Sequence, residues 1–198
     1  MPSPYETALA AIDAAHSEDP TMTELPGETD QIPYELHYAQ KSTSYLVQLN
    51  PNASETLRLA VRAQHFRRWE VPRSSYPMTR IGYHAWRTYL KKRQGELVST
   101  ICIESGLSPE ISEKVASLIR KEGLGKGDAE AQTLEDVACL VFLDDQFEGF
   151  EKGLKDEDKI IAILQKTWKK MSDQGHQFAL GMEMGDRQKA LVGKALAG

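Results

Sequence analysis

Residues 52–69 of the chain read NASETLRLAVRAQHFRRW, and this stretch decides the fold class. Asn52 and Glu55 have the spacing of a capping box, so we expect a helix that begins here and reaches Trp69. When the helix is plotted at about 100° per residue, its apolar side chains fall on two separate faces. The two faces are formed by Leu59, Ala63 and Phe66, and by Leu57 and Val61. A helix that is apolar on two sides is buried among other helices, which predicts a multi-helix bundle.

The rest of the chain is also helical in pattern, with no useful length of strand-like alternation. Capping residues at Ser3, Thr79, Ser108 and Thr133 mark helix starts. The expected helices cover about residues 4–15, 34–50, 79–106, 109–123, 133–147 and 157–172. Five acids in residues 17–33 predict an acidic loop, and residues 157–198 form a C-terminal helical extension. We therefore expect a single helical domain over residues 1–198, all-α and folded as a compact multi-helix bundle.

Composition excludes several classes of protein. No stretch of about 18 uncharged apolar residues is present, so no membrane span is expected. The first residues lack the basic and apolar regions of a secretory signal. Cys102 and Cys139 both fall in helical patterns and are expected to be reduced thiols. Together these features predict a cytoplasmic protein.

The charge of the chain is unevenly distributed. Residues 58–93 contain ten Lys or Arg and a single acid, Glu70, so their formal charge is +9. The whole chain carries −5, so the remaining residues sum to −14. A cationic centre in an acidic protein predicts a site that binds negative charge, most simply phosphate.

Part of this charge forms a stripe between the two apolar faces of the 52–69 helix. The stripe consists of Arg58, Arg62, His65 and Trp69. Because both neighbouring faces are apolar, we expect the stripe to face an interior cleft. The alternative is that these arginines extend to solvent and form salt bridges at an acidic surface.

Aromatic and cationic residues alternate in the 79–106 helix. This combination is typical of sites that stack bases and grip phosphates, although an amphipathic helix packs an aromatic core in the same way. With the stripe and the loop that follows it, the candidate ligand-binding residues are Arg58, Arg62, Arg67, Arg68, Trp69, Arg73, Arg80, Tyr83, His84, Trp86 and Arg87.

His65 and Asp136 are the candidate catalytic residues. Histidine has a pKa near neutral pH, so His65 is expected to act as a general acid or base. Asp136 shares the apolar face of the 133–147 helix with Leu140 and Leu143, where a carboxylate needs a partner. We expect it to pair with Arg62 or His65 or to bind a metal; exposure in the first turn of its helix is the alternative.

Several short motifs of the chain resemble those of a known protein family. They are AQHFRRWEVPR (63–73), SYP (75–77), GYHAWRT (82–88), QTLEDVACLVFL (132–143), KTWKKMS (166–172) and Gly175-His176. On these motifs, which span most of the chain, the sequence resembles the bacterial and fungal family catalogued as domain of unknown function 4202. Some fungal members bear a glutamyl-tRNA synthetase label, but this sequence contains no synthetase signature.

That family is in turn similar to the helical HD superfamily of metal-dependent phosphohydrolases, which implies a degenerate HD-like fold. The resemblance places His65 and Asp136 as ligands of a divalent metal, with His37 at the early His position. Phe66 stands where a metal-ligating Asp would be expected, so one ligand is missing. A site that has lost its metal and kept a pocket for a phosphorylated ligand is equally compatible with the resemblance.

Three functions follow as alternatives. The first is a pocket protein, expected to be an enzyme, that binds a phosphorylated small molecule or RNA, including aminoacyl-tRNA for tRNA-linked acyl transfer. The second is an HD-like metal-dependent nucleotide phosphohydrolase. The third is a non-catalytic interaction domain in which the basic centre and the acidic remainder neutralise each other.

Overall fold

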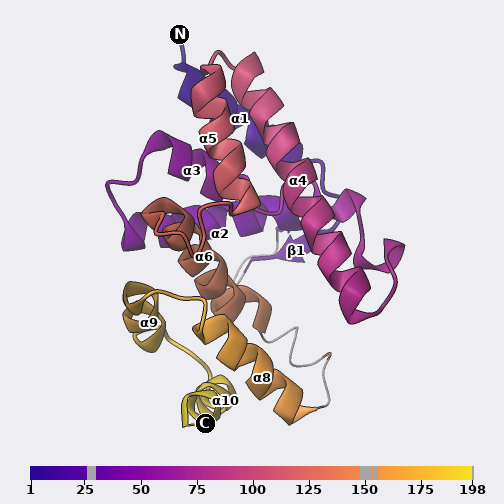
Figure 1. Cartoon of the computed structure of the whole chain (residues 1–198), viewed down its shortest axis with the longest axis vertical. Coiled ribbons are helices and arrows are strands. Elements are labelled where there is room, and N and C mark those ends of the chain that lie inside the picture. Colours follow the sequence, from indigo (N-terminus) through magenta and orange to yellow (C-terminus); the bar gives the residue numbers. More distant parts are fainter. Residues whose placement is uncertain (26–29, 148–152, 154–155, 198) are drawn as a thin grey trace.

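The computed structural model describes residues 1–25, 30–147, 153 and 156–197, and most of its regular structure is helical (Figure 1). The expectation of an all-α bundle is confirmed. In chain order the elements are α1 (Pro4–His16), β1 (Met22–Glu24), β2 (Gln31–Pro33), α2 (Tyr34–Leu49), α3 (Glu55–Arg62), η1 (Arg68–Glu70), η2 (Arg73–Ser75), α4 (Arg80–Glu104), α5 (Pro109–Arg120), α6 (Ala129–Val141), the π-helical segment η3 (Phe142–Gln146), α8 (Glu157–Trp168), α9 (Asp173–Leu180) and α10 (Asp186–Ala197).

Side-chain caps fix several helix starts as expected. Ser3 and Glu6 form a capping box at the start of α1, and Thr79 accepts a hydrogen bond from the backbone N–H of Gly82 at the start of α4. Ser108 caps α5 in the same way. These bonds satisfy backbone donors that have no partner within the helix, so the starts are readable from sequence.

The helix predicted over residues 52–69 is shorter than expected. Ser54, rather than Asn52, accepts the capping hydrogen bond, and α3 ends at Arg62. His65 and Arg67 then adopt positive φ values of 64° and 48°, which a right-handed helix cannot contain. The prediction that the helix reaches Trp69 is therefore wrong, and the expected stripe is divided between a helix and a loop.

Two other segments differ from expectation. Asp128 caps α6, so this helix begins at Ala129 rather than at Thr133, and Asp136 lies well inside it instead of in its first turn. Within the acidic loop 17–33, β1 and β2 pair as a short antiparallel ladder, with Thr23 opposite Ile32. Residues 26–29 of that loop lie outside the described part of the chain.

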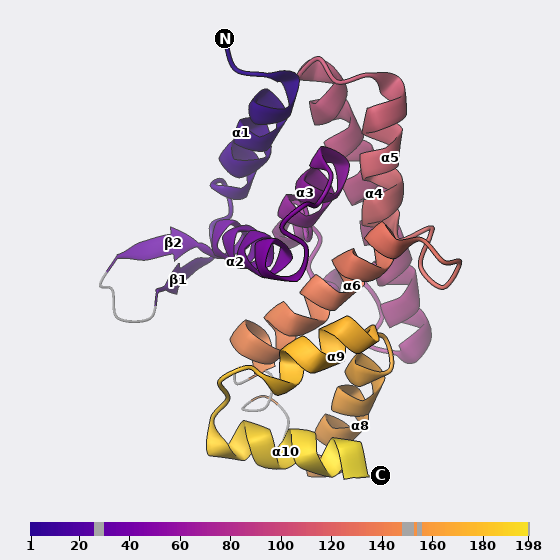
Figure 2. The same ribbon diagram turned by 90° about the vertical axis from the view of Figure 1, so that its left-hand side faces the viewer.

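The helices pack in two groups that share α6. α4 and α5 lie side by side and pack against α1 and α3, while α2 contacts both α3 and α6 (Figure 1). α6 extends from this group to α9, and α8 packs on α10 at the end of the molecule opposite the N-terminus (Figure 2). Large side chains buried where the helices meet include Tyr38, Leu59, Phe66, Leu134 and Leu140. Burial of one such side chain stabilises the fold by about 1.5–3 kcal/mol.

None of the described helices combines the length and the apolar character that crossing a bilayer requires.

Candidate ligand pocket

A cavity of about 1100 Å³ lies between α4 on one side and α6, η3 and α8 on the other; we call it the central pocket. One face of α4 lines it from Arg80 through Arg87 and Lys91 to Gln94. These residues span 14 positions, which corresponds to about 21 Å along the helix axis. The central pocket is therefore an elongated cavity large enough for a substantial ligand.

The wall of the central pocket is strongly cationic. Eight Lys or Arg residues line it together with one acid, Glu135. The cations are Arg68, Arg80, Arg87, Lys91, Lys121, Lys166, Lys169 and Lys170. Half of them lie outside the basic run 58–93 and were missed as site residues, because lysines near helix ends or on a helix surface give no distinctive sequence signal.

Arg68 is a cation of this wall whose partners are uncharged. Its guanidinium lies 4.8 Å from the ring centroid of Trp86, and Nη1 donates a hydrogen bond to His65 Nε2 at 3.1 Å. Within the described ranges, no carboxylate forms an ion pair with it. Burial lowers the pKa of Arg68, and the positive charge of Arg87 lowers it further. Two arginines thus share the pocket without an acid between them.

The backbone around Arg68 is held by Glu35, at the start of α2. Glu35 Oε1 accepts hydrogen bonds from the N–H groups of Arg68 and Trp69, and Oε2 accepts one from Arg67. Oε2 also lies 3.2 Å from Nδ1 of the fully buried His16. Glu35 is only 4% exposed, so it joins the positive-φ loop to the core. Sequence reasoning missed it, because an acid in the first turn of a helix is common.

His65 is a half-buried wall residue whose ring stacks on Tyr38, with centroids 4.3 Å apart. Burial lowers its pKa well below 6.5, and Arg68 and Arg87 lower it further. Because arginine only donates, the ring nitrogen that faces Arg68 must accept. His65 is therefore neutral at neutral pH, whereas the sequence predicted a pKa near the working pH.

Asp136 forms no hydrogen bond or ion pair with His65 or Arg62. Its Oδ1 accepts hydrogen bonds from the backbone N–H of Ser172 at 2.8 Å and from Gln132 Nε2 at 3.0 Å. Its Oδ2 accepts one from Ser172 Oγ at 2.5 Å. Two of the three expected alternatives for Asp136, a pair with Arg62 or His65 and an exposed first-turn position, are wrong: the side chain is buried and joins α6 to the start of α9.

The candidate ligand-binding residues divide between the central pocket and other places. Those that line it are Arg68, Arg80, Tyr83, His84 and Arg87. The residues outside its lining are Arg58, Arg62, Arg67, Trp69, Arg73 and Trp86.

Local partners explain why most of this second group lies elsewhere. Arg58 donates to backbone carbonyls, while Arg62 forms a two-bonded pair with Asp13. Arg67 pairs with Glu18 and Glu70. Arg73 donates to the carbonyls that follow it, and Trp86 Nε1 donates to the carbonyl of Val71. Trp69 has a buried Nε1 with no hydrogen-bond partner within the described residues.

Cys139 also lines the central pocket, but its thiol is unreactive. Burial, with the nearby charge of Glu135, raises its pKa to about 12. The thiolate is the nucleophilic form of cysteine, and almost none is present at neutral pH. Cys139 is therefore an apolar wall residue.

The residues present do not fit a divalent metal. In the described ranges, no group of three or more His, Cys, Asp or Glu side chains could hold one. The Asp136 carboxylate already accepts a hydrogen bond from Ser172, and His37 Nε2 lies 2.7 Å from Asp145 Oδ1, within hydrogen-bonding distance. The surroundings of His65 are cationic, which disfavours a second cation there.

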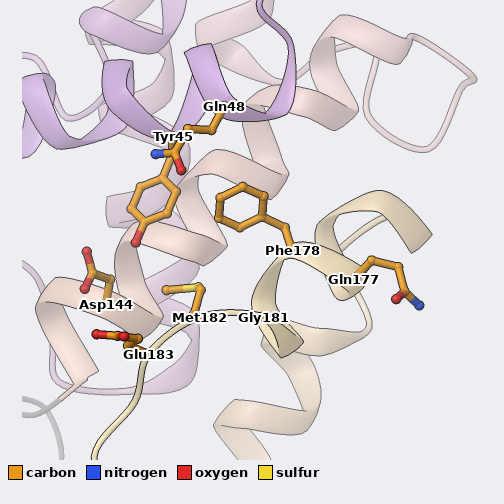
Figure 3. Close-up of a pocket in the computed structure, with 8 residues that line it drawn as sticks. All are labelled: Tyr45, Gln48, Asp144, Gln177, Phe178, Gly181, Met182 and Glu183. Carbon is orange, nitrogen blue, oxygen red and sulfur yellow. The ribbon is translucent and has the colours of Figure 1, made fainter.

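A second, smaller pocket of about 460 Å³ lies between α2, η3 and α9 (Figure 3). Tyr45 and Phe178 meet edge to face in it, with ring centroids 5.7 Å apart. Burial raises the pKa of Tyr45, and its hydrogen bond to Asp144 raises it further. The charged lining residues are the acids Asp144 and Glu183, so this pocket does not suit an anion.

Comparisons with known proteins give one result. The sequence model of a family described as "Domain of unknown function (DUF4202)" matches residues 6–192. No curated protein and no solved structure matches the chain.

Proposed function

Since the chain belongs to the DUF4202 family, whose description states no activity, we propose from its geometry that it binds a phosphate-bearing ligand in the central pocket. The pocket is a recess rather than a flat surface, which favours a phosphorylated small molecule over RNA as the ligand. Phosphate groups would be held by Arg68, Arg87 and Lys91.

The observation that carries the proposal is the proximity of Arg68 and Arg87, neither of which forms an ion pair with a described carboxylate. Placing two guanidiniums together in a partly desolvated site costs free energy unless an anion joins them. Among the described residues, Arg68 has no acidic partner, and its pKa is lowered by burial and by Arg87. A phosphate would remove this repulsion and accept the paired N–H groups in a bidentate geometry.

Lys91 extends the same positive field. Burial lowers its pKa, and the neighbouring charges of Lys121 and Arg87 lower it further. Glu135 offsets Lys121 and Lys170, with which it forms ion pairs, but one carboxylate cannot balance the whole wall. Glu135 also interacts with Arg87 and Lys91, but within the described residues no ion pair is formed by Arg68, Arg87 or Lys91, so positive charge remains in excess around them.

His65 contributes to this site as a neutral hydrogen-bond acceptor. Its bond to Nη1 fixes the plane of the Arg68 guanidinium, and stacking on Tyr38 fixes the ring itself. In this role it prepares the anion site, and the proposal requires no protonated imidazole.

The test is calorimetric titration of the purified protein with inorganic pyrophosphate at about 50 mM and 300 mM salt, concentrations at which screening differs clearly. We expect binding that weakens with salt. Arg68→Gln should reduce the affinity roughly tenfold or more, since a hydrogen bond to a charged group contributes about 1.5–3 kcal/mol.

Lys92→Gln is the matched control. Lys92 adjoins Lys91 on α4, but its side chain is 74% exposed and lies outside the pocket lining. Its loss changes the net charge by the same amount and should leave pyrophosphate affinity unchanged. Equal losses in both variants would mean that only general surface charge is involved, and the absence of binding would refute the proposal. Bulk tRNA titrated in parallel tests the RNA alternative.

A further inference from the structure

Besides its cations, the central pocket has an apolar section of wall, which we call the apolar recess. Leu90, Ile119 and Leu134 line this part of the wall, from α4, α5 and α6. Gln94 lies there too, one helical turn past Lys91. The recess therefore differs in chemistry from the arginine-lined part of the same pocket.

Two carboxamides lie in the lining of this recess. Gln64 and Gln94 are each only 6% exposed. Gln64 Nε2 donates to the carbonyl of Leu134 at 3.4 Å. The Nε2 group of Gln94 is buried, and none of the described residues accepts a hydrogen bond from it. A buried donor without an acceptor costs about 1–3 kcal/mol. Because Nε2 has no open surface, the carboxamide of Gln94 must turn this group towards the cavity before a ligand acceptor can recover that cost.

We propose that the ligand of the central pocket is a nucleotide whose base lies in this recess and accepts a hydrogen bond from Gln94. This inference rests on the proposed function, because it assigns the phosphate to Arg68, Arg87 and Lys91. A nucleobase has flat faces that suit apolar walls and an edge that carries hydrogen-bond acceptors. The recess offers both kinds of contact.

The spacing along α4 agrees with this arrangement. Gln94 follows Arg87 by seven residues, or about 10 Å along the helix axis. The interval leaves room for a ribose between the phosphate at Arg87 and the base at Gln94.

The experiment compares the four common nucleoside 5′-monophosphates with ribose 5-phosphate by calorimetric titration of the full-length protein. We expect at least one nucleotide to bind about tenfold more tightly than ribose 5-phosphate, since one hydrogen bond that satisfies a buried donor is worth about 1–2 kcal/mol. Gln94→Met keeps the length of the side chain and removes the amide. It should abolish this preference and leave the affinity for ribose 5-phosphate unchanged.

Two measurements separate recognition from folding. Thermal unfolding without ligand should show that Gln94→Met is at least as stable as the wild type, because the substitution removes an unsatisfied donor. Gln40→Met, on the exposed surface of α2, is the control substitution and should retain the nucleotide preference.

The outcomes distinguish this inference from the proposed function. If nucleotides bind no more tightly than ribose 5-phosphate, while Arg68→Gln still weakens both, the nucleotide assignment is overturned and the phosphate site stands. A preference that survives Gln94→Met overturns the assignment of the base to Gln94. If neither ribose 5-phosphate nor any nucleotide binds while pyrophosphate does, the nucleotide assignment is overturned and the phosphate site stands; if pyrophosphate also fails to bind, the phosphate site itself is refuted.

Discussion

The carboxylate of Glu35 accepts a hydrogen bond at 2.5 Å from the backbone N–H of Arg68, a residue 33 positions later in the chain. The same carboxylate receives the N–H groups of Arg67 and Trp69. The Glu35 carboxylate thus acts as an anion bound by a turn of backbone. Glu35 belongs to α2, which contributes Tyr38 but no cation to the central pocket. The direction of the Arg68 side chain therefore depends on a helix that supplies none of the positive charge.

Replacing Glu35 should therefore damage both the fold and the pocket. Glu35→Gln keeps the shape of the side chain but removes the charge and one acceptor. We expect the free energy of unfolding to fall by about 2–3 kcal/mol, because hydrogen bonds to an ionised group are lost. Urea denaturation measures the stability, and pyrophosphate titration should show weaker binding. Glu104→Gln, at the exposed end of α4, is the control and should change neither quantity.

His65 should make stability depend on pH in a defined direction. Its pKa in the folded protein lies well below 6.5, the value expected when unfolded, so between these values only the unfolded chain binds the proton. Its contribution is fully present above pH 6.5 and is lost as pH falls from there towards the folded pKa.

This prediction can be checked with His65→Asn, since asparagine tolerates positive φ. Urea denaturation at several pH values between 7.5 and 5 should show a smaller loss of stability in the variant than in the wild type. Equal losses would mean that His65 is not held neutral. The exposed His84, replaced in the same way, should leave the wild-type pH dependence intact.

The same substitution at two glycines should have opposite effects. A Cβ at Gly175 would lie 2.9 Å from Asp136 Cγ, closer than atoms can pack, so Gly175→Ala should destabilise by about 1–3 kcal/mol. A Cβ at Gly193, inside α10, meets nothing within 4 Å. Gly193→Ala should therefore stabilise the protein by about 0.5–1 kcal/mol, since alanine favours the helix. Thermal unfolding should show a lower melting temperature for Gly175→Ala and a higher one for Gly193→Ala than for the wild type.

We expect Asp136 to stabilise the fold and to make no contribution to ligand binding. Asp136→Asn weakens the bonds to Ser172 and should lower the free energy of unfolding by about 1–2 kcal/mol. Pyrophosphate affinity, measured where the variant remains folded, should stay within about twofold of the wild type, because Asp136 does not line the central pocket. A loss of affinity as large as that of Arg68→Gln, with unchanged stability, would instead return Asp136 to the binding site.

The sequence predicted the parts of the fold that local chemistry determines. Ser3, Thr79 and Ser108 cap the helices that they were expected to begin. The error at α3 has a different origin. Hydrophobic periodicity continues through Phe66, while the left-handed conformations of His65 and Arg67 are stabilised by Glu35, which is remote in sequence.

The candidate site was predictable along α4 and in the basic segment that precedes it. Arg80, Arg87 and Lys91 stand at i, i+7 and i+11, which places them on one helix face. They line one pocket, together with the predicted residues His65 and Arg68. The opposite wall depends on tertiary packing. Lys166 and Lys170 enter it because the end of α8 and the residues after it contact α6, where Gln132 Nε2 donates a hydrogen bond to the carbonyl of Lys170. Asp136 was misassigned because an acid on an apolar face signals a buried partner without identifying it.

The C-terminal helices carry a consequence for the architecture of the binding site. Ile163, Lys166, Thr167, Lys169 and Lys170 all belong to α8 or its C-terminal end, and all line the central pocket. The segment that the sequence presents as an appendage is thus one of the pocket's walls. A truncated chain that ended before residue 157 would retain every residue of the basic run, yet the central pocket would lose the part of its far wall that α8 and the residues after it supply.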